Sequence, residues 1–72
     1  MQNRILNIVK EHFGVDKVTP ETTAQDLGAD MLDRVELIES LENEFEITVV
    51  DSEIDQWSTI SDLTRLIISY RP

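Results

Sequence analysis

The chain offers few side chains that could carry out covalent chemistry. It has no cysteine, and its single histidine is His12. It also lacks a glycine-rich phosphate loop and any pair of histidines at metal-binding spacing. Asp30 and Asp33 are one helical turn apart and attract a divalent cation only weakly, so no tight metal site is expected. The sequence therefore predicts no catalytic residues and no enzyme.

Acidic side chains are concentrated in the middle of the chain. The formal net charge of the 72 residues is −9. Residues 26–55 hold eleven Asp and Glu against one basic residue, Arg34, and so carry −10. Such a charge repels nucleic-acid phosphates and anionic lipid headgroups and attracts basic protein surfaces. The alternative is that the charge only keeps a small domain soluble.

One amphipathic helix must position most of these charges. It is predicted to begin after Asp30, whose carboxylate suits an N-cap, and to continue to Phe45. Asp33 in its first turn is favourable against the helix dipole. At about 100° per residue, one face is apolar and is expected to be buried: Val35, Leu37, Ile38, Leu41 and Phe45. The other side is expected to be acidic and exposed: Asp33, Glu36, Glu39 and Glu46.

A first helix is predicted from Gln2 to Phe13, where apolar residues recur at core-facing spacing and Gly14 follows as a stop. His12 lies within this stripe near its solvent end. We interpret it as a structural boundary residue and not as a ligand. Residues 15–28 lack a helical pattern and are predicted to form a long loop. Four apolar side chains are expected to pin this loop to the core: Val15, Val18, Ala24 and Leu27.

Residues 47–50 are predicted to be an extended connection, because four strand-like residues with no partner segment make a poor sheet. Their valines, Val49 and Val50, are expected to fill the core. A short helix is then expected to begin at a cap provided by Asp51 or Ser52 and to continue to about Gln56.

A last helix is predicted from a capping box formed by Thr59 and Asp62. Its apolar face is Ile60, Leu63, Leu66, Ile67 and Tyr70, and Arg71 and Pro72 end it. The whole chain, residues 1–72, is therefore expected to be one all-α domain. It is a four-helix bundle with three main helices, one short helix and a long first loop.

The central helix resembles a known family. The residues that carry the resemblance are Leu27-Gly28-Ala29-Asp30, Leu32-Asp33 and Val35-Glu36-Leu37, with Glu42, Glu44 and Phe45 beyond. They resemble the attachment helix of acyl carrier proteins. The resemblance implies a carrier that holds acyl intermediates as thioesters on a 4′-phosphopantetheine arm during fatty-acid or polyketide-type biosynthesis. It places the attachment position at Met31, between Asp30 and Leu32.

In the family, the attachment position is a serine, whose hydroxyl becomes a phosphodiester. Met31 has a thioether with no exchangeable proton, so this chain is expected to remain without the arm. Ser40 lies about two and a half turns further along the helix and is no geometric substitute. Two origins of Met31 are open: a deliberate substitution in an ordinary carrier, or a natural relative that lost the arm and kept the docking surface.

Two further positions depart from the family pattern. Thr23 stands where an aromatic residue is common, and Trp57 stands where an aliphatic residue usually lines the pocket that shelters acyl chains. Trp57 either reflects a relative with changed function or compensates for the aromatic volume missing at Thr23, because cores keep volume more than identity.

The resemblance also implies partners. Basic surfaces of acyl-chain synthesis or transfer enzymes, and of phosphopantetheinyl transferase, are expected to dock on this helix. The implied contact residues are Leu32, Asp33, Val35, Glu36, Glu42 and Glu44, with Asp30 beside them. Glu39 occupies a position where the family often has an apolar contact residue.

Two rival functions remain open at this point. One is an interaction-only acidic helical module that binds a basic partner and carries nothing. The more distant one is a peptidyl carrier of nonribosomal synthesis. No apolar run is long enough for a membrane span, and the first residues lack the pattern of a signal peptide. A cytoplasmic monomer that binds no nucleic acid is expected.

Overall fold

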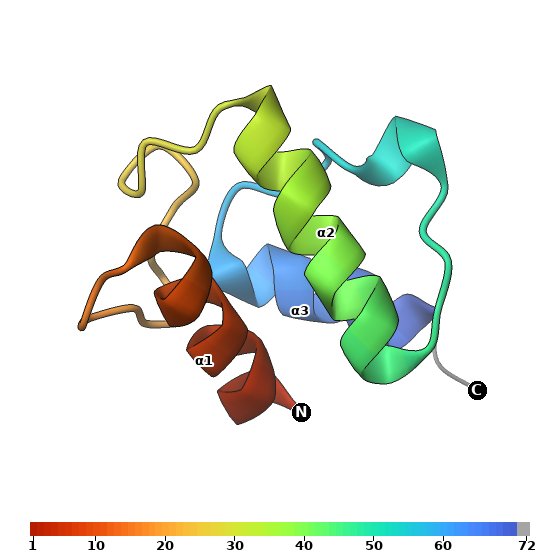
Figure 1. Ribbon diagram of the computed structural model, residues 1–72, viewed down its shortest axis with the longest axis horizontal. Coiled ribbons are helices and arrows are strands. Elements are labelled where there is room, and N and C mark those ends of the chain that lie inside the picture. Colours follow the sequence, from red (N-terminus) through yellow and green to blue (C-terminus); the bar gives the residue numbers. More distant parts are fainter. Residues whose placement is uncertain (71–72) are drawn as a thin grey trace.

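In a computed structural model, which describes residues 1–70, the chain folds into three α-helices and one short 3₁₀ helix. The elements are α1 (Gln2–Phe13), α2 (Met31–Phe45), η1 (Asp51–Glu53) and α3 (Ile60–Ser69). In the view of Figure 1, α2 crosses in front of α3, with α1 on one side and η1 on the other. The described residues contain no strand, and only an isolated antiparallel bridge joins Thr23 to Thr59. The all-α prediction is confirmed.

The ends of the helices follow from local sequence. Gly14 has φ 64°, a left-handed conformation that glycine adopts without strain, and its N–H donates to the Lys10 carbonyl to end α1. Capping boxes begin the other two α-helices. In α3 the Thr59 hydroxyl accepts from the Asp62 N–H, and the Asp62 carboxylate accepts from the Thr59 N–H. The predicted starts of both helices are therefore confirmed.

The core lies where the three α-helices meet. Each α-helix contributes fully or almost fully buried side chains, namely Ile5, Val9, Leu37, Ile38, Leu41, Ile60, Leu63 and Ile67. The connections add four more, namely Val18, Ala24, Val49 and Trp57. The long first loop is part of the packed domain, because two of its side chains, Val18 and Ala24, belong to this core.

α1 and α2 pack against each other in antiparallel directions. At one end Arg4 pairs with Glu44, and at the other end His12 contacts Asp33. The C-terminus of α1 therefore lies beside the N-terminus of α2, which is also the region that the sequence marks for function.

Several detailed predictions were wrong. Val15 and Val50 are exposed, so neither pins a connection to the core. Neither Asp51 nor Ser52 caps a helix by its side chain, because η1 is a single 3₁₀ turn that follows Val50. The short helix that was predicted to continue to about Gln56 is therefore reduced to one turn of three residues, which forms few hydrogen bonds.

On α2, Val35 is only half-buried and lies outside the core cluster. Glu46 is not on the helix, because it is the C-cap, in a left-handed conformation with φ 55°. Tyr70 caps the C-terminus of α3. The predicted end at Arg71 and Pro72 lies outside the described residues. Within residues 1–70, no helix combines the length and apolar character that a membrane span requires.

Candidate functional site

Met31 is the first residue of α2, and its side chain is held out to solvent. It is 53% exposed, and the next residue, Leu32, is 64% exposed. The two residues that form the cap lie on either side of this pair. Asp30 Oδ1 accepts from the Asp33 N–H at 2.8 Å, and Asp33 Oδ2 accepts from the Asp30 N–H at 3.2 Å. The side chain of residue 31 is therefore displayed at a capped helix start without taking part in the cap.

The chemistry available at residue 31 depends on its side chain. A helix N-terminus carries partly unsatisfied N–H groups and positive potential, which favour a phosphate group nearby. A hydroxyl here could be esterified by a phosphate, but the Met31 thioether has no proton to lose. Ser40 is no replacement, because its Oγ lies in the second half of α2 and donates to the Glu36 carbonyl at 3.2 Å.

The surface that continues from Met31 along α2 is an outer ridge, which we define as Leu32, Val35, Glu36 and Glu39. Leu32, Glu36 and Glu39 are exposed, and Val35 is half-buried. Among residues 1–70, Glu36 and Glu39 have no hydrogen-bond or ion-pair partner for their carboxylates. This ridge combines apolar contact area with unpaired negative charge, which suits contact with a basic protein surface.

Two other predicted contact residues are engaged within the molecule. Glu42 Oε2 accepts from the Val49 N–H at 2.8 Å, which ties the end of α2 to the following connection. Glu44 Oε2 accepts from Arg4 Nε at 3.2 Å, and this pairing raises the pKa of the Arg4 guanidinium. Glu42 and Glu44 are therefore less available to a partner than Glu36 and Glu39.

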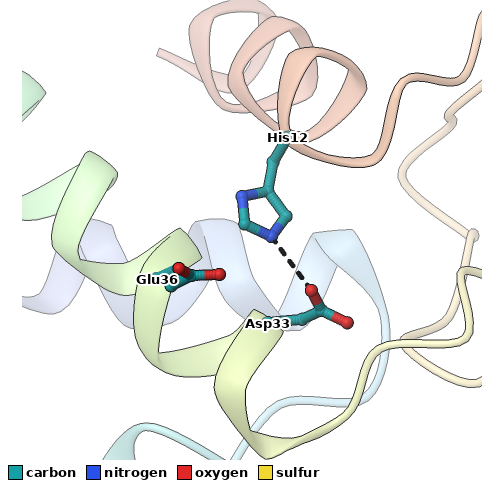
Figure 2. Close-up of side chains that lie close together, drawn as sticks. All are labelled: His12, Asp33 and Glu36. Carbon is teal, nitrogen blue, oxygen red and sulfur yellow. Dashed lines mark hydrogen bonds and ion pairs between the residues drawn. The ribbon is translucent and has the colours of Figure 1, made fainter.

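Asp33 is also turned inward. It is half-buried, and Figure 2 shows its carboxylate beside the ring of His12, which reaches down from α1. His12 Nε2 and Asp33 Oδ1 are 3.3 Å apart. The Asp30 N–H and then the His12 side chain stabilise the ionised carboxylate and hold the pKa of Asp33 below its usual value.

The sequence did not reveal this contact, because the two residues are 21 positions apart and their pairing depends on how α1 docks on α2. The only sequence feature that hinted at this contact was the position of His12 at the end of the apolar face of α1. An open hollow of about 530 Å³ adjoins the contact, between α1 and α2. It is lined by Ile8, Glu11, His12, Ser40, Asn43 and Glu44.

On the other side of α2, Trp57 is 2% exposed and belongs to the core. Its Nε1 donates to the Ile54 carbonyl at 2.9 Å. Arg34, the single basic residue of the acidic stretch, donates from Nη1 to the Trp57 carbonyl at 2.9 Å. Because Arg34 is directed to Trp57, it does not neutralise the unpaired carboxylates of the outer ridge.

Comparison with known proteins gives a consistent result. Residues 3–67 match the family described as phosphopantetheine attachment site. The chain is 41% identical over 66 residues to an acyl carrier protein of Syntrophobacter fumaroxidans, which covers 88% of this chain and 82% of the relative.

Solved structures share the fold. The crystal structure of an acyl carrier protein from Thermotoga maritima superposes with a TM-score of 0.79 at 28% identity, over 94% of this chain and 82% of that one. A chain from the structure described as the ishigamide ketosynthase/chain length factor gives a TM-score of 0.81 at 23% identity. That match covers 96% of this chain and 90% of the other, and it supports the fold alone.

Proposed function

The chain belongs to the phosphopantetheine-attachment family of acyl carrier proteins, and on that basis we propose that it serves acyl-chain synthesis of the fatty-acid or polyketide type. Its role there is to present α2 to basic surfaces of the synthesis enzymes and of phosphopantetheinyl transferase. It acts as a docking partner and not as an enzyme. Met31 prevents the arm from being attached to this chain.

The observation that carries this proposal is the exposure of Met31 at the capped start of α2, directly before the outer ridge. A modifying enzyme must reach the side chain of residue 31 while it binds the helix beyond it. Met31 and Leu32 are both exposed, and among residues 1–70 the carboxylates of Glu36 and Glu39 form no hydrogen bond or ion pair. These features together supply an accessible attachment position and a surface for docking.

A second function is favoured by Met31 itself. A chain that keeps the exposed ridge but has no hydroxyl at residue 31 is suited to bind a basic partner without carrying an acyl group. The two functions share the docking surface and differ in whether position 31 can be modified once a serine is restored.

The loading experiment uses the chain, Met31→Ser and Met31→Ala. Each is incubated with coenzyme A and a broad-specificity phosphopantetheinyl transferase, and intact mass is recorded. We expect a single added arm on Met31→Ser and none on the other two. Ser40 and the other native serines serve as internal controls, because they are present in all three proteins.

Failure of Met31→Ser to gain the arm would favour the interaction-only module. A mass gain on the unchanged chain would contradict the assignment of residue 31. A mass gain on Met31→Ala as well as on Met31→Ser would mean that a residue other than residue 31 accepts the arm.

The docking experiment measures how fast Met31→Ser is modified at low and high salt. Adding Glu39→Lys should slow modification by about three- to tenfold at low salt, because an exposed ion pair is worth up to about 1 kcal/mol and the new charge is repulsive. The difference should shrink at high salt. Glu21→Lys is the matched control, since Glu21 is exposed but lies in the first loop. Equal slowing by both changes would indicate that only net charge matters.

A further inference from the structure

Three side chains with metal-binding atoms meet where α1 and α2 come together. The ligand atoms of His12, Asp33 and Glu36 all lie within 4.8 Å of one another. In Figure 2, the His12 ring enters from α1, with Asp33 on one side of it and Glu36 on the other. Asp33 and Glu36 are three residues apart on α2, a spacing that places both carboxylates on the same side of the helix.

The separation between the first two ligand atoms suits a shared metal ion. Ligands that lie about 2.1 Å from one zinc ion at a tetrahedral angle are about 3.4 Å apart. His12 Nε2 and Asp33 Oδ1 are already 3.3 Å apart. Glu36 is exposed and its carboxylate oxygen lies within 4.8 Å of the other two ligand atoms, so a side-chain rotation can bring it to the same spacing.

The two inner ligands are held in place by contacts outside the cluster. Asp33 Oδ2 accepts from the Asp30 N–H, which directs Oδ1 toward His12. The His12 ring packs edge-on against Phe13, with ring centroids 4.8 Å apart. Hydrogen-bonded partners such as the Asp30 N–H orient metal ligands before the ion arrives.

The charge of the cluster is not balanced by the protein. Among the described residues, neither Asp33 nor Glu36 forms an ion pair with a lysine or arginine. The neighbouring Arg34 is engaged with Trp57 instead. Two carboxylates and an imidazole, with no lysine or arginine paired to them among these residues, therefore favour a cation as a fourth member.

We propose that His12, Asp33 and Glu36 bind one Zn²⁺ ion, which links the end of α1 to the start of α2 one turn from Met31. The imidazole nitrogen selects zinc over Mg²⁺ and Ca²⁺, because these harder cations take oxygen ligands. Water completes the coordination, since three protein ligands leave a position open. Because the ion binds the folded arrangement of two helices, zinc also raises the unfolding temperature.

Isothermal titration of the tag-free chain with zinc chloride tests the site directly. We expect saturable binding of one ion per chain, and weaker, histidine-independent binding of Mg²⁺ and Ca²⁺. His12→Gln and Glu36→Gln should each weaken zinc binding at least about tenfold, the effect typical of losing a ligand or its support. Glu39→Gln is the matched control, because it removes the same charge from an exposed position of the same helix.

Zinc titration followed by NMR of the His12 ring gives a second readout, in which the ring resonances should shift together with the binding isotherm. Absence of one-to-one binding would overturn the proposal. So would equal weakening by Glu39→Gln and Glu36→Gln, or zinc binding that leaves the His12 resonances unchanged. Glu36 is exposed and its carboxylate forms no hydrogen bond or ion pair within residues 1–70, so Glu36→Gln tests the site without disturbing the fold.

Discussion

The guanidinium carbon of Arg34 lies 4.6 Å from the centre of the Trp57 ring. The same side chain donates a hydrogen bond to the Trp57 carbonyl. One arginine on α2 thus holds both the ring and the backbone of the segment that leads into α3. Cation–π contacts of partly buried residues contribute about 0.5–2 kcal/mol and a net hydrogen bond about 0.5–1.5 kcal/mol.

Arg34→Ala should therefore lower the free energy of unfolding by about 1–3 kcal/mol. Urea denaturation followed by circular dichroism measures the change. Lys17→Ala is the matched control, since Lys17 is an exposed loop residue and its removal should stay within about 0.5 kcal/mol. Equal effects of the two changes would show that the Arg34–Trp57 contact contributes nothing to stability.

Trp57→Ala removes the largest side chain of the core. We expect a loss of about 3–5 kcal/mol in the free energy of unfolding, because the buried contacts disappear and a cavity remains. Thermal unfolding by circular dichroism is the measurement. Ile68→Ala, at an exposed position of α3, should change stability by no more than about 0.5 kcal/mol. A similar small change for Trp57→Ala would contradict its place in the core.

Glu46→Gly should make the protein more stable. Glu46 ends α2 with φ 55°, a conformation that costs a side-chain-bearing residue about 1–2 kcal/mol and glycine nothing. The greater freedom of glycine in the unfolded chain offsets part of this, which leaves a gain of about 0.5–1 kcal/mol. Denaturation with urea tests the gain. Glu39→Gly within the helix should instead destabilise by about 1 kcal/mol.

Acid should weaken the start of α3. The Asp62 carboxylate accepts hydrogen bonds from the N–H groups of Thr59 and Ser58, and the Thr59 bond is the main reason that the pKa of Asp62 lies below its usual value. The folded state favours the ionised Asp62 carboxylate, so this carboxylate stabilises the fold at pH values above the ordinary aspartate pKa, near 4. The effect is lost as the pH falls from there through the lowered value.

Unfolding midpoints measured between pH 7 and pH 2 should therefore fall more steeply in the unchanged protein than in Asp62→Asn. Asp16→Asn serves as control, because Asp16 is an exposed loop residue. It should leave the slope nearly as it is. A slope that Asp62→Asn does not reduce would argue against this carboxylate as the acid-sensitive group of the cap.

Local signals in the sequence predicted much of this fold correctly. Gly14 marks the end of α1, and the pairs Asp30–Asp33 and Thr59–Asp62 mark the starts of α2 and α3. Each signal acts within four residues and does not depend on tertiary packing. The cap of α2 is even more complete than predicted, because Asp33 returns a hydrogen bond to the Asp30 N–H.

The errors concern residues whose environment depends on packing between distant segments. Val50 is apolar like its neighbour Val49, yet an extended chain turns them to opposite sides and only Val49 reaches the core. Asp33 was predicted on the exposed face, but docking of α1 places His12 against it. The sequence pattern of one helix cannot tell which of its flanks a second helix will cover.

The two hydrogen bonds between Asp30 and Asp33 enclose residue 31 without touching its side chain. The cap that starts α2 and the side chain of residue 31 are thus structurally independent. The side chain of residue 31 can therefore change while the Asp30–Asp33 cap keeps the starting point of α2. Proteins that bind the outer ridge of α2 would therefore meet the same surface whichever side chain stands at residue 31.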